Sequence, residues 1–599
     1  MRNKILLVLP IIITVTALYT SCNNTKDDQS PKQQKEIVYL NQGWTANDRA
    51  EFYWAPQGSA LLSYDIYMAL KDPATNIAIN AASTTDQFGF LREYNNHPKN
   101  PDGLPIGIAR SEVKEGPFKG DYIGLTCAAC HTNEIEYNGK FIRIDGGNST
   151  AIQLTPWLKL VSASLDHAQS NKEAFQELLA TISKTKKVDE KDLRKRLDED
   201  AEFVKSWLNK GLFSKNEAGP GRADAFGGIN NAFLGIHTGI WENIKATNAP
   251  VKPPFLWNSS HSAWVEWSGV SNNPLQRNYS EALGVFARYD LTPKADPKNL
   301  DITTVDARWL FKIEQMIRKL APPQWPEDIF GKIDQAKAAR GAILFQQNCA
   351  KCHSTYPHRW SDELAMGKRM IENTIVPQHK IGTDPENLNS AALDTNAIVF
   401  TKHLKSFFNG KEKVTPTAFF QVAEGAMMKR SLQSQQFTEA EILDAFGYHT
   451  TEQLMYEKPP FNSYKAAPRD GSWAIGPFLH NGSVPTIYEL LSPAKERTTT
   501  FYTNTVFDPV NVGLSLGAKS GKFLLDTRLE GNSNAGHSFE NGKGPGIIGR
   551  LFTKEERYEI IEYLKSIPTS PAQVTPYGGP ANPVIAKKDS TWIKNQKQK

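Results

Sequence analysis

Residues 335–353 read QAKAARGAILFQQNCAKCH, and this stretch decides the fold around it. Its first part predicts a helix, because small and apolar residues recur at helical spacing. The stretch ends in Cys-x-x-Cys-His, the pattern by which a c-type haem is attached to a chain. Two thiols about one helical turn apart reach the two vinyl groups of one porphyrin, and the histidine that follows lies under the iron as its proximal ligand. The residues at helical spacing are Ala338, Gly341, Ala342 and Phe345.

A second helix is expected near the C-terminus. Residues 553–556 read TKEE, a capping box that begins a helix, and Pro568 ends it. A helix that precedes Cys-x-x-Cys-His and is crossed by a C-terminal helix closes small cytochrome c folds, and Gly341 lets the two helices cross closely. Residues 354–553 form a long insertion between them, so this domain is heavily elaborated. The apolar stripe of the second helix is Ile560, Ile561, Leu564 and Ile567.

The attachment pattern occurs twice, in residues 127–131 and 349–353, and uses four of the five cysteines. A thioredoxin-like redox pair needs no following histidine, and a zinc ribbon keeps its two halves roughly 15–20 residues apart. A disulfide framework is not expected in a long chain with few cysteines. The sequence therefore predicts two covalently bound haem c groups. Their attachment residues are Cys127, Cys130, Cys349 and Cys352, and their proximal iron ligands are His131 and His353.

The N-terminus predicts export. A short positive region precedes the apolar residues 5–18, which are too few for a comfortable transmembrane helix. Residues 19–22 (YTSC) resemble a bacterial lipobox, in which the cysteine is acylated; the alternative is an ordinary secretory signal with a chance cysteine. We expect residues 1–21 to be a lipoprotein signal peptide and residues 22–35 a disordered tether. The lipid on Cys22 would then be the sole membrane anchor, facing the periplasm or the cell surface.

Composition and organisation set the remaining fold expectations. With 40% hydrophobic residues, 22% charged residues and a net charge of +5, the chain is typical of a soluble globular protein. No basic stripe with interleaved aromatics indicates nucleic acid. A proline-rich segment, residues 322–326, interrupts the helical pattern. We expect a mainly α protein of two cytochrome c-like haem domains with long loop-rich insertions, in residues 36–325 and 326–570, followed by a polar tail in residues 571–599.

Further stretches accompany the two haem motifs, namely residues 42–44, 52–53, 57–64, 103–107, 221–227, 382–385, 473–486 and 531–537. With them, the chain resembles the bacterial dihaem cytochrome c peroxidase superfamily, and within it the long rubber-oxygenase-like branch. The resemblance implies a reactive N-terminal haem, where peroxide or dioxygen meets iron, and a six-coordinate C-terminal haem that handles electrons. It also implies one structural calcium ion and a small periplasmic electron donor, either a cytochrome or a cupredoxin.

The resemblance places an apolar distal wall of the reactive haem in a segment rich in aromatic residues. The alternative for each of these residues is plain core. Glu266 is of the right type for a general acid–base over the iron, and its alternative role is a solvated or salt-bridged glutamate. The catalytic candidates are therefore Glu266, Trp267 and Phe286, with Trp257 and Trp264 as neighbours in the wall.

Arg222 and Asp224 lie together in residues 221–227, which read GRADAFG. An arginine close to an exported haem often pairs with a propionate, because the guanidinium matches a carboxylate in a bidentate way. Arg222 is therefore a candidate partner of a haem propionate. The alternative is an internal Arg222–Asp224 pair that shapes the loop.

The second axial ligand of the C-terminal haem is narrowed by elimination. Many bacterial cytochrome c peroxidases use methionine there, but the last of the eight methionines is Met455. None follows His480, where the methionine of the family lies, so histidine is the expected ligand and gives a lower reduction potential. His537 lies in a glycine-containing loop that permits unusual backbone angles. The rubber-oxygenase-like branch takes its ligand from a histidine so placed, so His537 is favoured over His480.

Three functions remain open. The first is reduction of hydrogen peroxide of the cytochrome c peroxidase type, with electrons passing from the C-terminal to the N-terminal haem. The second is a haem-dependent dioxygenase that cleaves an unsaturated apolar substrate, and the third is a non-enzymatic electron-transfer lipoprotein. The long form of the chain favours the oxygenase-like branch in ancestry. Ancestry does not fix the substrate, because function depends on the site, and peroxide reduction is the leading hypothesis.

Overall fold

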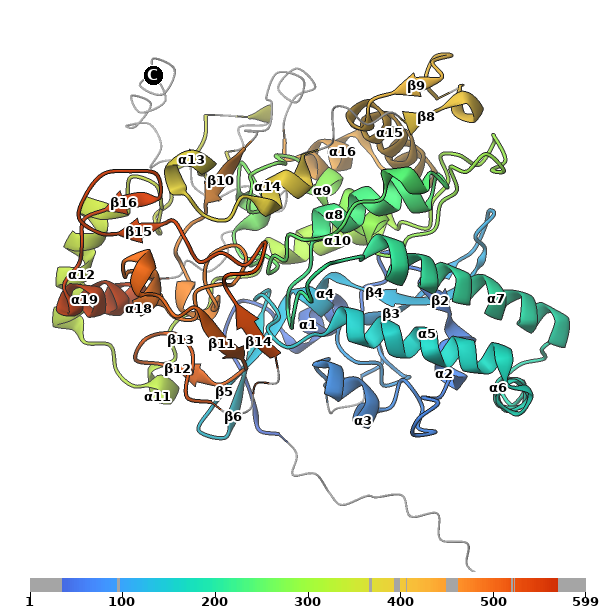
Figure 1. Cartoon of the computed structure of the whole chain (residues 1–599), viewed down its shortest axis with the longest axis horizontal. Coiled ribbons are helices and arrows are strands. Elements are labelled where there is room, and N and C mark those ends of the chain that lie inside the picture. Colours follow the sequence, from blue (N-terminus) through green and yellow to red (C-terminus); the bar gives the residue numbers. More distant parts are fainter. Residues whose placement is uncertain are drawn as a thin grey trace, which may run out of the picture. The chain divides into compact units, whose positions relative to one another are not determined.

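The computed structural model describes residues 35–568 except 94–96, 363, 366–368, 393–398, 406, 449–461, 519–520 and 522. The described residues from Ile37 onward belong to one compact unit (Figure 1). Among them no helix is long and apolar enough to cross a membrane. The predicted signal peptide with Cys22, nearly all of the tether and the polar tail lie outside the described residues.

The expectation of a mainly α fold is wrong. Helices make up 39% of the described residues and strands 14%, and the strands form several small sheets. Two three-stranded sheets lie next to the first haem motif in the chain, with the orders β2-β4-β3 and β1-β6-β5. Their strands are β1 Ile37–Tyr39, β2 Leu62–Ser63, β3 Ile108–Val113, β4 Gly120–Leu125, β5 Thr132–Tyr137 and β6 Lys140–Asp145.

The surroundings of the first haem motif explain this failure. The motif lies on α4 (Cys127–Cys130), a helix of four residues between β4 and β5, and not at the end of a long helix as in a small cytochrome c domain. β5 and β6 pair as an antiparallel hairpin. Its turn residues Asn138 and Gly139 have φ of 48° and 78°, and Asn-Gly between two strands is the strongest short-range hairpin signal. The sequence thus carries a hairpin signal in a domain that was expected to be mainly α.

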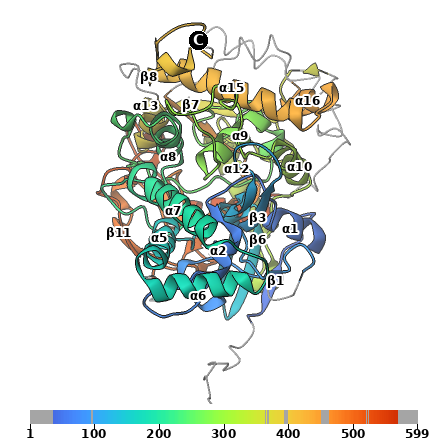
Figure 2. The same ribbon diagram turned by 90° about the vertical axis from the view of Figure 1, so that its right-hand side faces the viewer.

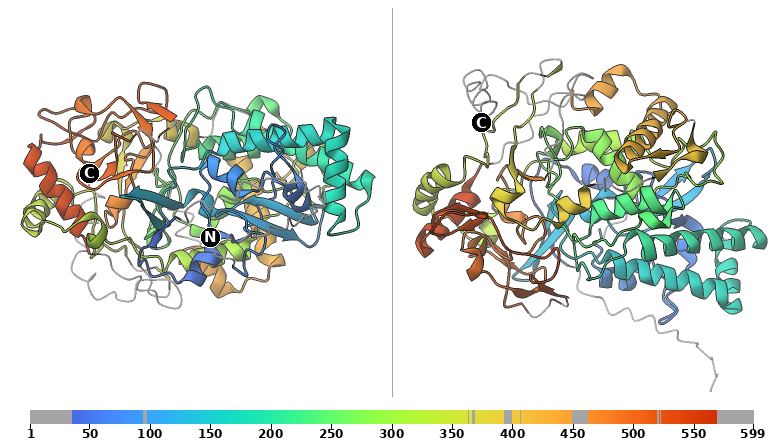
Figure 3. Two further views of the ribbon diagram at one scale, coloured as in Figure 1. Left: turned by 90° about the horizontal axis from the view of Figure 1, so that it is seen from below. Right: turned by 45° about the horizontal axis from the view of Figure 1, so that its top comes forward.

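The second haem motif follows the expected helix pair. α12 (Gln335–Asn348) crosses α19 (Lys554–Ser566), and the two lie side by side in both views (Figures 1 and 3). The capping box at Thr553 is confirmed, because its side chain accepts a 3.2 Å hydrogen bond from the Glu556 backbone N–H. A Cβ atom on Gly341 would overlap the Glu559 backbone carbonyl. Glycine at position 341 therefore sets how closely the two helices approach.

The remaining long helices pack around a continuous hydrophobic cluster that runs in sequence from Leu40 to Ile567. α5 packs against both α6 and α7 (Figure 2), and α9 contacts α8, α10 and α15. A two-stranded antiparallel sheet joins β7 (Thr374–Pro377) to β10 (Ser463–Ala466). The main helices are α1 Ala46–Tyr53, α2 Tyr64–Ala69, α5 Leu154–Ser170, α6 Lys172–Ser183, α7 Glu190–Ser206, α8 Ala225–Asn231, α9 Pro274–Gly284, α10 Ala307–Ile317, α15 Pro416–Ser434 and α16 Glu439–Ala445.

Candidate active site

The first haem motif is held by capping and by a neighbouring glutamine. The Thr126 side chain caps α4 by accepting a hydrogen bond from the Ala128 backbone N–H, and the Cys127 backbone N–H donates to Gln57 Oε1 at 3.1 Å. His131 follows directly. Burial, and then the charge of Arg277, lower the pKa of His131 to about 4, against a hydrogen bond to the Pro254 backbone. The ring is therefore neutral at physiological pH, which is the form that binds a metal.

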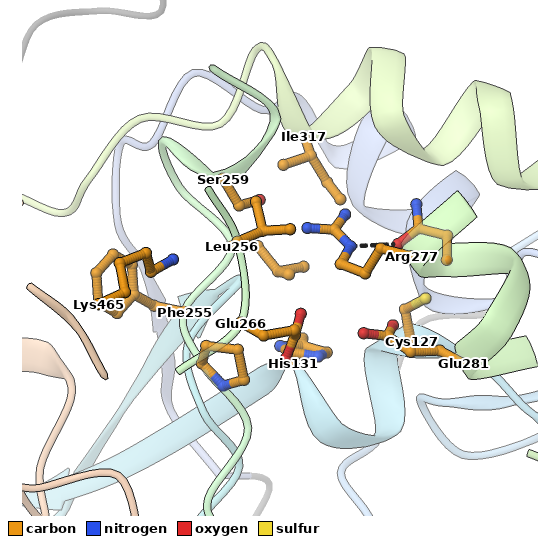
Figure 4. Close-up of a pocket in the computed structure, with 13 residues that line it drawn as sticks. Cys127, His131, Phe255, Leu256, Ser259, Glu266, Arg277, Glu281, Ile317 and Lys465 are labelled. Atoms are coloured by element: carbon orange, nitrogen blue, oxygen red, sulfur yellow. Dashed lines mark hydrogen bonds between the residues drawn. The ribbon is translucent and has the colours of Figure 1, made fainter. Parts of the chain in front are cut away.

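A cavity opens beside Cys127 and His131 (Figure 4). Its empty volume, with the adjoining open solvent included, is about 420 Å³. One attachment cysteine and the proximal histidine on the wall, with an apolar lining behind them, fit a large planar cofactor. Its other lining residues are Pro254, Phe255, Leu256, Ser259, Val265, Glu266, Arg277, Asn278, Glu281, Ile317 and Lys465.

Two glutamates face each other in this cavity. Glu281 lies on α9, and Glu266 lies in a loop with a φ of 63°, an unusual value for a residue with a side chain. Burial, the charge of Glu266 and a hydrogen bond between the two carboxyls raise the pKa of Glu281 to about 8, against the attraction of Arg277. Glu281 therefore keeps its proton at neutral pH, because a carboxyl close to a second carboxyl is harder to ionise.

Two cations complete the polar side of the cavity. Arg277, one helical turn before Glu281, forms a buried ion pair with Glu314, and Glu314 also accepts a 2.6 Å hydrogen bond from the Asn278 side chain. Lys465 comes from β10, far away in the sequence. Burial lowers the pKa of Lys465 to about 8, although Glu266 opposes the shift. The cavity thus holds opposed charges in an apolar surrounding, where electrostatic interactions are strong.

The second haem motif brings two histidines together. His353 Nδ1 lies 2.9 Å from the Ala467 carbonyl oxygen, so this nitrogen donates and Nε2 is left as the lone-pair nitrogen. The ring centroids of His353 and His537 are 6.3 Å apart. His537 Nδ1 is buried and has no hydrogen-bond partner among the described residues. Burial, the larger cause in each case, lowers the pKa of His353 well below its ordinary value and that of His537 to about 3.

This geometry fits one haem iron between two imidazoles. A metal–imidazole bond is about 2.0 Å long, and with the distance from nitrogen to ring centre on each side the two centroids come to lie roughly 6 Å apart. An unpaired buried ring nitrogen is costly unless a ligand satisfies it. His537 itself has a φ of 45° and follows Gly536, whose φ is 70°. A Cβ atom on Gly536 would overlap the Gly382 backbone, so glycine lets the loop reach this position.

Residues 463–502 match the family described as RoxA-like, cytochrome c-like. Protein y4iJ of Sinorhizobium fredii (strain NBRC 101917 / NGR234) is 32% identical over 584 residues, which cover 90% of this chain and 94% of that protein. The chain belongs to the family of that rhizobial protein. Protein y4iM of the same strain is 27% identical over 369 residues, 57% of this chain and 71% of that protein.

The match assigns this member of the y4iJ family to the haem-dependent oxidoreductases with covalently bound haem c. It supports the rubber-oxygenase-like branch, while membership of the wider peroxidase superfamily stays a prediction. A single segment of the chain matches a cytochrome c-like model. Together with the strands around α4, this corrects the expectation of two cytochrome c-like domains. The matched segment contains Lys465 of the first site and Ala467 of the second.

The residues predicted as catalytic or as part of the distal wall do not all line the cavity. Of the catalytic candidates, Glu266 lines the cavity, whereas Trp267 donates to the Lys252 carbonyl at 2.7 Å and Phe286 packs edge-on against Trp207. Trp257 stacks on Phe255 with centroids 4.9 Å apart, and its indole N–H donates to the Asp470 carbonyl. The Trp264 backbone N–H donates to Asn373. None of these four predicted aromatic residues is among those that line the cavity.

His480 and Arg222 are both engaged by protein groups. His480 Nε2 is 3.1 Å from the Tyr464 hydroxyl, and the rings stack with centroids 4.4 Å apart. Arg222 donates to the Ala218 and Asn481 carbonyls and to Asn532 Oδ1. Asp224 instead accepts from the Gly227 and Ala249 backbones and from Ser390. His537 as iron ligand and Arg222 as propionate partner stay predictions, and the geometry favours the first.

The implied calcium ion stays a prediction. Among the described residues, no group of three or more histidine, cysteine or acidic side chains is arranged to hold a metal ion. The sequence did not single out Arg277, Glu281 and Lys465, although the spacing of the first two is that of one helix face. Lys465 comes from a distant strand, and no local pattern indicates its position.

Proposed function

We propose that this protein is a dihaem c-type cytochrome that reduces hydrogen peroxide in the cavity beside His131. The observation that supports the proposal most directly is the hydrogen-bonded carboxyl pair of Glu266 and Glu281 in that cavity. An attachment cysteine and a proximal histidine share a wall with a proton donor and a proton acceptor. Peroxide reduction needs this combination, because the O–O bond breaks easily only when the departing oxygen receives a proton.

The roles of the residues follow from their charges. A haem bound through Cys127, Cys130 and His131 would bind the peroxide and deliver electrons to it. Reduction of one hydrogen peroxide to two waters takes two electrons and two protons and breaks the O–O bond. The Glu281 carboxyl, protonated at neutral pH, gives its proton to the departing oxygen, and Glu266 accepts the proton of the incoming molecule. Protons from solvent then restore the pair, while Arg277 and Lys465 limit the negative charge in the cavity.

The second site is suited to supply the electrons. Lys465 lines the first cavity, and the Ala467 carbonyl two residues later faces His353. Two residues of extended chain span about 7 Å, so one short segment of the chain contacts both sites. His353 and His537 would hold a six-coordinate haem with no free position, which favours electron transfer over ligand binding. The electrons would come from a small exported cytochrome or cupredoxin.

Donor-dependent peroxide consumption by the purified, haem-loaded protein tests the proposal. Glu281→Gln keeps the size of the side chain and removes its exchangeable proton, so turnover should fall by about 10²–10⁴. Glu424→Gln is the matched control. Glu424 is also buried with a raised pKa of about 7, but it hydrogen-bonds Ser280 and Gln276 and does not line the cavity. Equal losses in both variants, or none in Glu281→Gln, would remove the acid–base role.

A second candidate is dioxygenation of an unsaturated apolar compound, favoured by the RoxA-like match of residues 463–502 and by the apolar side of the cavity, with Phe255, Leu256 and Ile317. Oxygen uptake with an olefin and without any electron donor would support it. Peroxide loss that depends on a reduced donor supports peroxide reduction. If neither assay detects activity and the protein exchanges electrons rapidly, it would be an electron carrier and not an enzyme.

A further inference from the structure

The carbonyl oxygen of Ala467 accepts two hydrogen bonds. One comes from His353 Nδ1 at 2.9 Å and the other from Arg469 Nε at 3.0 Å. The Arg469 Nε also donates to the Pro468 carbonyl at 3.1 Å. A carbonyl that accepts from a guanidinium has less electron density to offer a second donor. The presence of Arg469 therefore weakens the hydrogen bond that polarises the His353 ring.

The charge of Arg469 has no direct ion pair among the described residues, although the neighbouring Asp470 carboxylate attracts it. Arg469 is half-buried, and among the described residues no carboxylate lies within ion-pair distance of it. The adjacent Asp470 carboxylate is 3.1 Å from His358 Nε2 and accepts hydrogen bonds from Asn258 and from the Tyr356 backbone. The charge of Arg469 acts on the rings of both His353 and His537. Arg497 acts more strongly than Arg469 on His537, and Arg359 also acts on His353, so Arg469 is the cation whose charge reaches both predicted axial ligands.

We propose that Arg469 is a positioning residue that raises the reduction potential of the haem held by His353 and His537. The inference rests on that haem and its two ligands, and not on peroxide as the substrate. Two effects act in the same direction. A stronger hydrogen bond from a ligating histidine makes the ring a better donor to the metal, which favours ferric iron, and Arg469 weakens that bond. A positive charge near the iron also favours the ferrous form, which carries one positive charge less.

Spectroelectrochemical titration of the haem-loaded protein tests this inference, with Arg469→Lys, Arg469→Gln and Arg469→Met. Arg469→Met removes both the charge and the hydrogen bond. It should shift the equilibrium of the low-spin haem toward the ferric form by on the order of tenfold, a potential lowered by about 59 mV for one electron. Arg469→Gln should show most of this shift, and Arg469→Lys, which keeps the charge, the least. The low-spin electron paramagnetic resonance signal should persist in all three, because both histidines remain.

Arg92→Gln is the control for the loss of one positive charge. Arg92 is also partly buried, and it donates to the Gly103 and Asn80 carbonyls and to the Thr85 hydroxyl. Its replacement should change the potential several-fold less than Arg469→Gln. An unchanged potential in Arg469→Gln overturns the inference, and so does an equal shift in Arg92→Gln, which would make the effect one of net charge. If Arg469→Met does not bind haem, the difference in reduction potential between Arg469→Lys and Arg469→Gln still tests the inference. Absence of a low-spin signal from the wild-type protein would instead contradict His353 and His537 as the two axial ligands.

Discussion

The two Cys-x-x-Cys-His motifs have the same sequence pattern but differ in the secondary structure around them and in the side chains that face their histidines. The first lies on a four-residue helix between strands, and its histidine opens on a cavity with four ionisable side chains: Glu266, Arg277, Glu281 and Lys465. The second follows a long helix crossed by another, and its histidine faces a second histidine across 6.3 Å. Attachment chemistry is thus set locally, whereas the reactivity of an iron held at either motif would depend on which side chains the rest of the chain places opposite it.

The largest effect is expected when the two haem attachment sites are removed one at a time. The double variant Cys127→Ala/Cys130→Ala should keep one covalent haem with a low-spin spectrum and lose all peroxide turnover. Cys349→Ala/Cys352→Ala should keep one haem that still binds cyanide, because the first cavity remains. Wild type should carry two haems that survive acid–acetone extraction, measured by mass and by the pyridine haemochrome spectrum. A single haem in wild type, or cyanide binding lost only in the second variant, would contradict the division of roles.

The acidity of the first cavity offers a pH test. The protonated form of Glu281 is required as the acid, and its pKa is raised to about 8. Turnover should therefore be full near pH 7 and fall as pH rises through about 8, since deprotonation removes the acid. Glu281→Gln should abolish this basic limb along with most of the activity, by about 10²–10⁴. A basic limb that persists in Glu281→Gln would assign it to another group, with Lys465 the next to test.

The second site predicts a change of spin state without loss of haem. His537→Gly should convert the low-spin haem to a high-spin form that binds added imidazole, because glycine keeps the backbone angle at this position and removes the ligand. His480→Gly should leave the low-spin spectrum intact, since His480 is hydrogen-bonded to Tyr464. Absorption spectra with and without imidazole measure both outcomes. The opposite pattern would make His480 the ligand.

Local chemistry was predictable from the sequence, and long-range assembly was not. Spacing alone identifies both attachment motifs, the capping box at Thr553 and the close approach at Gly341. The first half was expected to be mainly α because its Cys-x-x-Cys-His motif was assigned to a cytochrome c-like domain, whereas Asn138-Gly139 next to the motif forms the turn of a hairpin. The partners of Glu266 come from α9 and β10, and contacts between elements so far apart leave no periodic pattern. Acylation of Cys22 and export stay predictions, because residue 22 lies outside the described range.

The smallest expected effect is a difference in thermal stability between the surroundings of the two haem motifs. A Cβ atom at Gly341 would overlap the Glu559 carbonyl, whereas Gly425, inside α15, has no atom within 4 Å of the same position. Gly341→Ala should therefore destabilise the α12–α19 crossing by about 1–3 kcal/mol, as overpacking does. Gly425→Ala should stabilise its helix by up to about 1 kcal/mol. Thermal unfolding followed at the absorption of each haem should show an earlier transition for the second haem in Gly341→Ala, with the first less affected. Equal shifts at both haems would mean that the sites unfold together, as the continuous hydrophobic cluster allows, and the contrast between them would then lie in chemistry alone.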